Sequence, residues 1–446
     1  MSISNLGVTN YGSVTFVDLT SAAEIQQLDI DGHPIFNLDL SQNVDLNKLS
    51  VRNCGLTSIN ISNSPLLTSI NVEGNLLNNI NIANRSNLWG INAASNCLTS
   101  LDTTGIPNLD YINVSNNPGI SSIDISSNLS MDYLYASKCV ALTGINLIPN
   151  WRIDYVDLSY CPLITSIDIN ELRSLDAIWL RGCSLTEFSP PGEGIAGGSR
   201  SDELVLIDVA YNYINDLDLY IGSNPPHGAG LEDAGHLDVS YNQLTSLRVE
   251  ATAATEVTLI ADNNPALESI VRVGSLNYFK TFWARDCNLQ GILDFANYSG
   301  TAVLTTDVRV SNNNLTLVNI LDTPSIRLGM THLMVDNNNI STGIDISNMG
   351  GVNFKSLRLN DNSLSYITAA QFKGVNGECW WHNNNLDTDD IYNTLNQATI
   401  AEIPTEVTIY GNPAVNSGIL QDGTLFTASQ LQNLASAKNY TLKLTN

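Results

Sequence analysis

The chain has 446 residues, of which only 14% are charged, but its 44 acidic residues outnumber its 19 lysines and arginines and give a formal net charge of −25. This charge argues against a nucleic-acid partner, because a phosphate backbone needs a basic face that displaces its counterions. It also disfavours binding to anionic membrane surfaces. No apolar run reaches the length of a membrane span, so we expect no membrane insertion.

Residues 1–24 are expected to form an N-terminal cap. They begin with MSISNLGVTNYGS, which lacks the basic start and the apolar core of a secretory signal, so we expect a cytoplasmic or virion-associated location. The stretch VTFVDL (Val14–Leu19) alternates in the manner of a strand. We expect this strand to cover the open sheet edge of the fold that follows.

Residues 25–415 repeat one short pattern. LTSINIS, which starts at Leu56, returns as LTSINVE at Leu67. The frame L-x-x-L-x-L-x-x-N-x-L fits about 17 coils, and its ninth position serves as the anchor of each coil. Successive anchors are 21 or 22 residues apart as far as Cys183 and 22 to 30 residues apart afterwards. The anchors are His33, Cys54, Asn75, Asn96, Asn117, Cys139, Cys161, Cys183, Asn212, Asn242, Asn264, Cys287, Asn313, Asn338, Asn362, Asn384 and Asn412.

Alternating apolar residues predict two short strands in each coil. In one strand Ile70 and Val72 point inward while Asn71 points outward. In the other, Ile59 and Ile61 point inward. Parallel stacking of such strands from successive coils would form two parallel sheets around one apolar core.

The anchor residue is expected to hydrogen-bond the backbone. An Asn amide both donates and accepts, so it can pair backbone groups that the bend leaves without partners. Five anchors are cysteines instead, and stacked thiols about 4.8 Å apart could form disulfides or hold a metal. However, side chains in register point the same way, and seven cysteines are an odd number. We therefore expect free thiols, no metal site and no cofactor.

This frame resembles the leucine-rich-repeat family, in the short variety of about 21–22 residues seen in bacterial and phage-type proteins. The resemblance implies a mainly β fold: a right-handed leucine-rich-repeat solenoid with two parallel β-sheets, few helices and terminal caps. Members of the family bind unrelated partners on one scaffold, so the resemblance implies a binding role without identifying the partner.

Two interruptions lengthen consecutive coils, near residues 189–203 and 221–235. Their sequences, SPPGEGIAGGSRSDE and GSNPPHGAGLEDAG, are rich in Pro and Gly and predict loops. Loops from neighbouring coils should lie on the same flank of the fold. Two interpretations of these loops stay open: contact sites for a partner, and tolerated surface insertions. The G-x-G-x-x-G pattern at Gly192, Gly194 and Gly197 follows no strand and opens no helix, so we assign it no phosphate-binding role.

The C-terminal part contains helical signals. D-T-D-D at Asp387–Asp390 lacks the Gly and Glu of a calcium loop and more plausibly starts a helix, DIYNTLNQA. Residues 416–446 are expected to form a C-terminal cap. In this cap TASQLQNLASAKN, starting at Thr427, predicts a helix, and YTLKLT predicts a strand.

Outward positions of the first strand place acidic and aromatic residues in columns across neighbouring coils. The predicted ligand-binding residues are Trp89, Asp110, Tyr111, Asp132, Tyr133, Tyr135, Asp154, Tyr155, Asp176 and Trp179, and we predict no catalytic residue. Farther along, the same surface carries Lys280, Trp283, Arg285, Arg309, Lys355, Arg358 and Trp380. Copying of a harmless repeat would explain these columns, and so would a contact face for a protein or a glycan.

The sequence favours a non-enzymatic binding scaffold that recognises a protein or carbohydrate surface through its strand-lined face or its flank loops. The alternative is a structural component of a virion or larger assembly, such as a phage adhesin or decoration protein. An enzyme that acts on polysaccharide is a third hypothesis. Neighbouring aspartates of a column would be about 5 Å apart and alternate ones about 10 Å apart, which brackets glycosidase spacings.

Overall fold

The computed structural model describes residues 5–7, 14–147, 150–172, 174–191, 204–221, 235–251, 257–274, 279–295, 305–319, 330–347, 354–368, 375–397, 405–410, 412, 417–419 and 425–444. The chain forms two compact units, which we describe separately. Unit 1 consists of Met1–Ile214 and Leu219–Gly230, and unit 2 of Asn215–Asp218 and Leu231–Asn446. The finer division into two caps and a solenoid stays a prediction.

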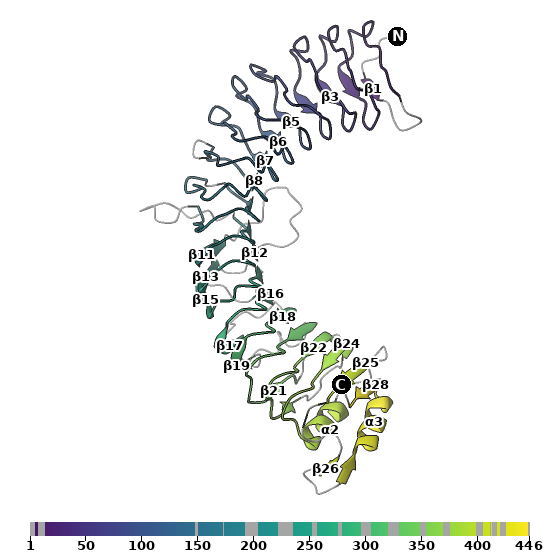
Figure 1. Ribbon diagram of the computed structural model, residues 1–446, viewed down its shortest axis with the longest axis vertical. Helices are drawn as coiled ribbons and strands as arrows, with labels where there is room; N and C mark the ends of the chain where they lie inside the picture. Colours follow the sequence, from purple (N-terminus) through teal and green to yellow (C-terminus); the bar gives the residue numbers. More distant parts are fainter. Residues whose placement is uncertain are drawn as a thin grey trace. The chain divides into compact units, whose positions relative to one another are not determined.

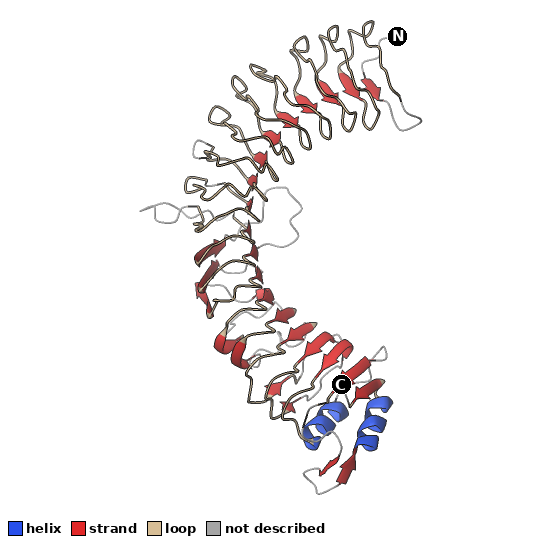
Figure 2. Cartoon of the chain, in the orientation of Figure 1, coloured by secondary structure: helices blue, strands red, loops and turns tan. Residues whose placement is uncertain are grey.

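Unit 1 is built on one parallel sheet of three-residue strands (Figures 1 and 2). Each strand pairs with the next along the chain, from β1 with β2 to β9 with β10. The strands are β1 (Asn5–Gly7), β2 (Gln27–Asp29), β3 (Lys48–Ser50), β4 (Ser69–Asn71), β5 (Gly90–Asn92), β6 (Tyr111–Asn113), β7 (Tyr133–Tyr135), β8 (Tyr155–Asp157), β9 (Ala177–Trp179) and β10 (Leu206–Asp208).

From β2 to β10, the middle residue of each strand belongs to the core of unit 1. Ile70, Ile91 and Ile112 stand in register on neighbouring strands, and none is more than 1% exposed. Removing such columns of apolar side chains from water is the main favourable term in folding. The prediction of a mainly-β parallel solenoid is confirmed.

The second strand of each coil forms differently in the two units. In unit 1, Ile61 is buried as predicted, but Ile59–Ile61 lie in no strand. The reason is a turn, because Asn60 Oδ1 accepts a hydrogen bond from the Ser62 amide, and Asp102 and Asp124 form the same turn in later coils. This local bond bends the chain where a strand would have to continue.

Unit 2 has the second sheet in short pieces. These are formed by β13 (Ser246–Ala251) with β15 (Ser269–Gly274), β17 (Gln290–Asp294) with β19 (Asn314–Asn319), and β21 (Ile344–Asp345) with β23 (Ile367–Thr368). β11 (Asp216–Ile221) contains residues of both units. The main parallel sheet of unit 2 comprises β12 (His236–Asp238), β14 (Val257–Ile260), β16 (Phe279–Trp283), β18 (Asp307–Arg309), β20 (His332–Met334), β22 (Phe354–Arg358), β24 (Val375–Trp380), β25 (Thr405–Thr408) and β28 (Tyr440–Lys443).

Two helices and a hairpin lie in the C-terminal part of unit 2. α2 (Thr388–Gln397) starts where the D-T-D-D signal predicts, and α3 (Ala428–Ala437) and β28 confirm the predicted helix and strand (Figure 2). Thr427 caps α3 through a capping box with Gln430. β26 (Ser417–Ile419) and β27 (Leu425–Thr427) form the antiparallel hairpin. At the other end, Val14–Leu19 is not a strand; β1 pairs with β2 instead.

The asparagine anchors form the predicted ladder. Asn117 Nδ2 donates to the carbonyls of Ala93 and Val114, and its Oδ1 accepts from the amide of Leu98 in the preceding coil. The same pattern recurs at Asn75, Asn96, Asn264, Asn313, Asn338, Asn362, Asn384 and Asn412. Each anchor thus satisfies buried backbone groups of two coils, and unsatisfied groups of this kind are costly.

Four of the five cysteine anchors, all except Cys54, follow a coil in which a turn replaces the bond to the anchor oxygen. In the coil before Cys139, the Ile120 amide donates to the Asn117 carbonyl. This backbone bond takes the place of the bond that the anchor Oδ1 accepts in the asparagine coils. Cys139 Sγ then only has to donate, and its acceptor is Val114 O at 3.3 Å. The same i+3 turn precedes Cys161, Cys183 and Cys287. In these four coils the i+3 turn accompanies cysteine in place of asparagine.

All seven cysteines are free thiols, as predicted. Cys97 is exposed, whereas burial raises the pKa of Cys161 to about 12 and the pKa of Cys183 to about 11. Because thiolates are the reactive form, the buried anchors are inert structural thiols.

The residue before each anchor from His33 to Asn384 adopts a left-handed backbone conformation. Asn, Asp, Ser or Gly occupies most of these positions, as expected for residues that tolerate positive φ. The exceptions are Lys138, Tyr160, Tyr211 and Tyr241. Lys138 and Tyr160 have φ of 59° each, and Tyr160 is about half exposed. A Cβ on Gly182 in the next coil would lie 2.9 Å from the Tyr160 ring, so this ring rests on a glycine.

Tyr160→Asn is expected to raise the free energy of unfolding by about 0.5–1 kcal/mol, because Asn adopts the left-handed conformation at lower cost. Lys138→Asn provides the matched control, since Lys138 has the same φ in the neighbouring coil. Urea denaturation of both variants measures the effect. A loss of stability at Tyr160 together with a gain at Lys138 would show that the ring contact with Gly182 outweighs the backbone strain.

Candidate functional site

The strand-lined face of unit 1, meaning the outward side of β5–β9, carries the predicted columns. Tyr111, Tyr133 and Tyr155 pair in register, and so do Tyr135, Asp157 and Trp179. The aspartate column runs beside them, because the amide of each aspartate bonds to the carbonyl of its counterpart in the preceding coil. The repeat therefore brings the side chains together as the sequence predicts.

Four tyrosines form a tyrosine cluster, defined as Tyr111, Tyr133, Tyr135 and Tyr155. The ring centroids of Tyr111 lie 6.3 Å from Tyr133 and 5.8 Å from Tyr135, with tilted planes. Tyr133 and Tyr155 stack at 5.1 Å with an interplanar angle of 5°. Burial raises the pKa of Tyr135 to about 12, so its hydroxyl stays protonated. Trp89 is 47% exposed at the start of the columns, and Trp179 is half-buried at their end.

Two of the predicted residues are not exposed. The expected exposure of Tyr155 and Asp176 is wrong, because they are only 2% and 1% exposed. The Tyr133 ring stacks on Tyr155, and the Tyr155 hydroxyl donates to Asp176 Oδ2 at 3.2 Å. Strand alternation turns these side chains outward, but neighbours cover them there. Their role is therefore to support Tyr133.

Asp110 and Asp132 form a carboxyl pair that sequence reasoning did not single out. Burial and then the neighbouring charge of Asp132 raise the pKa of Asp110 to about 6, and the charge of Arg152 opposes this. Burial and a neighbouring negative charge both disfavour the ionised form, so Asp110 keeps its proton to a higher pH than an exposed aspartate does. The register of two aspartates in adjacent coils was the available signal, but its effect depends on burial, which the sequence does not reveal.

Asp110→Asn is expected to stabilise the protein above about pH 6 and to have little effect near pH 4. The folded-state pKa of Asp110 lies above the ordinary value, so the folded state binds the proton more tightly than the unfolded chain does. Wild-type stability therefore falls as the pH rises through about 6, whereas Asn does not ionise. Urea denaturation across this pH range measures the difference. Parallel stability curves for the two proteins would contradict the raised pKa of Asp110.

The outward face of unit 2 carries arginine–aromatic–carboxylate groups. The Arg309 guanidinium lies 4.3 Å from the Trp283 ring centroid and makes two hydrogen bonds of 2.8 Å to Asp307. Arg285 lies over the same ring and pairs with Asp262. In the same way, Arg358 lies 4.1 Å from the Trp380 centroid and makes two hydrogen bonds of 2.8 Å to Glu378. Lys280 and Lys355, which the sequence places on this face, belong to none of these three groups.

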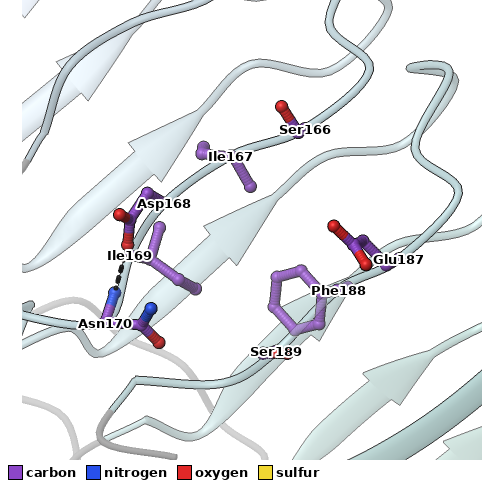
Figure 3. A pocket seen from close by; sticks show the side chains of 8 residues that line it. All are labelled: Ser166, Ile167, Asp168, Ile169, Asn170, Glu187, Phe188 and Ser189. Atoms are coloured by element: carbon purple, nitrogen blue, oxygen red, sulfur yellow. Dashed lines mark hydrogen bonds between the residues drawn. The ribbon is translucent and has the colours of Figure 1, made fainter.

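A pocket of about 270 Å³ lies away from the columns in unit 1 (Figure 3). Its walls come from two neighbouring coils and are Ser166, Ile167, Asp168, Ile169, Asn170, Glu187, Phe188 and Ser189. Asp168 Oδ1 accepts a hydrogen bond from the Asn170 amide and closes a turn. This turn forms one part of the pocket wall. Residues 192–203 and 222–234, which include most of both predicted flank loops, lie outside the described residues.

Within the described ranges, no group of three or more His, Cys, Asp or Glu residues is arranged to hold a metal ion. No described helix combines the length and the hydrophobicity needed to cross a membrane.

Comparison with known proteins finds the fold but no close relative. No family model and no curated protein matches the sequence. Among solved structures, the functional domain of InlJ from Listeria monocytogenes is 18% identical, with 90% of this chain and 80% of that chain covered and a TM-score of 0.53. A leucine-rich-repeat protein of Leptospira interrogans is 16% identical, with 99% and 96% covered and a TM-score of 0.53. A TDR receptor is 14% identical, with 96% and 82% covered and a TM-score of 0.52. Together with the sequence repeat and the asparagine ladder, these likenesses show that the chain has the leucine-rich-repeat fold.

Proposed function

We propose that the chain is a non-enzymatic binding scaffold that contacts a protein partner through the strand-lined face of unit 1. The tyrosine cluster supports this proposal most strongly, because its rings are held by each other and lose little conformational freedom on binding. Trp89 adds an exposed ring beside the cluster. Tyrosine and tryptophan combine a large apolar surface with a polar group, which suits protein interfaces.

A protein partner fits the ring geometry better than a glycan does. One face of Tyr133 is covered by Tyr155, and Tyr111 is tilted by 45° and 52° against its neighbours. The exposed rings therefore form an uneven surface with no flat shelf on which successive sugar rings could stack. A protein surface has side chains of different sizes and can therefore be complementary in shape to such an uneven surface.

Catalysis on polysaccharide is disfavoured by the surroundings of the column aspartates. A glycosidase needs two carboxyl groups that reach the substrate. Asp176 is 1% exposed and accepts a hydrogen bond from the Tyr155 hydroxyl. The pocket in Figure 3 is lined by none of the column aspartates. A role as a virion or assembly component has no observation in its favour among the described residues and stays a prediction.

Capture of proteins from the source organism by immobilised variants tests the proposal. Tyr133→Ala should lose the partner that the wild type captures, whereas Tyr213→Ala should keep it, because Tyr213 is 53% exposed but belongs to no column. A third variant lacks residues 192–199 of the first flank loop. Retention by Tyr133→Ala together with loss in the deletion would move the site to the loop and contradict the proposal.

A further inference from the structure

The protein contains its own examples of how an arginine side chain is held on a strand-lined face. Arg309 and Arg358 each lie over a tryptophan and make two hydrogen bonds to one carboxylate. In unit 1, Arg181 lies 5.4 Å from the Tyr211 ring centroid and pairs with Asp208 at 2.8 Å. The recurring group is a guanidinium, an aromatic ring and a carboxylate.

The strand-lined face of unit 1 presents two of these three parts. Tyr135 and Asp157 are register neighbours on β7 and β8, as Trp283 and Arg309 are on β16 and β18. Asp157 Oδ1 accepts from the Ser159 amide, and no described lysine or arginine forms an ion pair with Asp157 or with Asp132. An aromatic ring and a carboxylate therefore stand together at Tyr135 and Asp157, and the described residues supply no guanidinium to these two side chains.

We infer that arginine side chains of a basic partner protein complete these groups, with one guanidinium over Tyr135 paired to Asp157. This inference rests on the proposed function and specifies the partner's chemistry. The net charge of −25 favours approach by a cationic protein. Asp110 and Asp132 add negative charge near Tyr133 of the same tyrosine cluster.

Arginine fits this surface better than lysine does. Its planar guanidinium can stack on a tyrosine and donate two parallel hydrogen bonds to one carboxylate, whereas an ammonium group acts as a compact point charge. A preference for arginine over lysine therefore separates this site from general attraction between opposite charges.

Binding of short labelled peptides to the full chain tests the inference. The probes are a peptide of alternating glycine and arginine and its lysine counterpart of the same length and charge, measured by fluorescence anisotropy. The arginine peptide should bind at least about fivefold more tightly to the wild type. Asp157→Asn and Tyr135→Leu should both remove this preference, and Tyr135→Phe should keep it because the ring remains.

Asp102→Asn is the matched control for charge. Asp102 is fully exposed in a turn on another side of the coil, and Asn can accept the same turn hydrogen bond. This variant should keep the arginine preference. Equal binding of the two peptides to the wild type, or a preference that survives both Asp157→Asn and Tyr135→Leu, would overturn the inference. Capture of a partner through Tyr133 could still succeed in that case, so the proposed function would stand separately.

Discussion

Ile112→Asp is expected to lower the free energy of unfolding by at least about 3 kcal/mol, because it places an ionisable group among apolar side chains without a partner. Ile112 is 0% exposed and stands in register between Ile91 and Leu134. In a stack of coils each coil depends on its neighbours, so the defect should loosen the coils on both sides.

Guanidinium denaturation with hydrogen exchange measures this effect. Ile112→Val is the matched control and should cost only about 1 kcal/mol, since it removes one methylene. The amides of β5 and β7 should lose protection in Ile112→Asp and keep it in Ile112→Val. If the aspartate variant unfolded like the wild type, the inward register of this coil would be wrong.

Asn117→Ala is expected to cost about 3 kcal/mol, because it removes hydrogen-bond partners from buried backbone groups in two coils. The Leu98 amide loses its acceptor, and the Ala93 and Val114 carbonyls lose a donor. Cys139→Ala should cost only about 1 kcal/mol, because the Cys139 thiol supplies one weak hydrogen bond and no acceptor is needed in its coil.

The comparison of Asn117 with Cys139 tests whether an i+3 turn in the preceding coil removes the need for an anchor that accepts a hydrogen bond. Urea denaturation of both variants gives the difference in unfolding free energy. Asn117→Cys extends the test, since it restores a donor but leaves the Leu98 amide without an acceptor, and it should remain clearly less stable than the wild type. Equal losses at Asn117 and Cys139 would show that the turn does not remove this need.

The repeat made most of the fold predictable. Apolar alternation identified the inward residues of the first strand, and the anchor frame identified the asparagine ladder, because both depend on contacts repeated at a fixed step. The second strand of the regular coils was not predictable in this way. Asn60 and Asp102 look like outward residues of a strand, but their side chains bond to the backbone two residues later and form turns.

The candidate site was predictable in position but not in exposure. Register placed the aspartates and tyrosines side by side, yet Tyr155 and Asp176 are covered by neighbours. Whether a neighbouring side chain buries a residue depends on the tilt of the aromatic rings. The repeat pattern does not determine this tilt. The raised pKa of Asp110 has the same origin, since burial is its largest cause.

Site-specific photo-crosslinking to the captured partner tests the central claim most directly. A photoreactive phenylalanine analogue replaces Tyr111 on the strand-lined face in one protein and Thr104, an exposed turn residue on another side of the coil, in a second. We predict that the analogue at position 111 crosslinks to the partner and that the analogue at position 104 does not. Crosslinking from position 104 with none from position 111 would contradict the assignment of the strand-lined face as the contact surface.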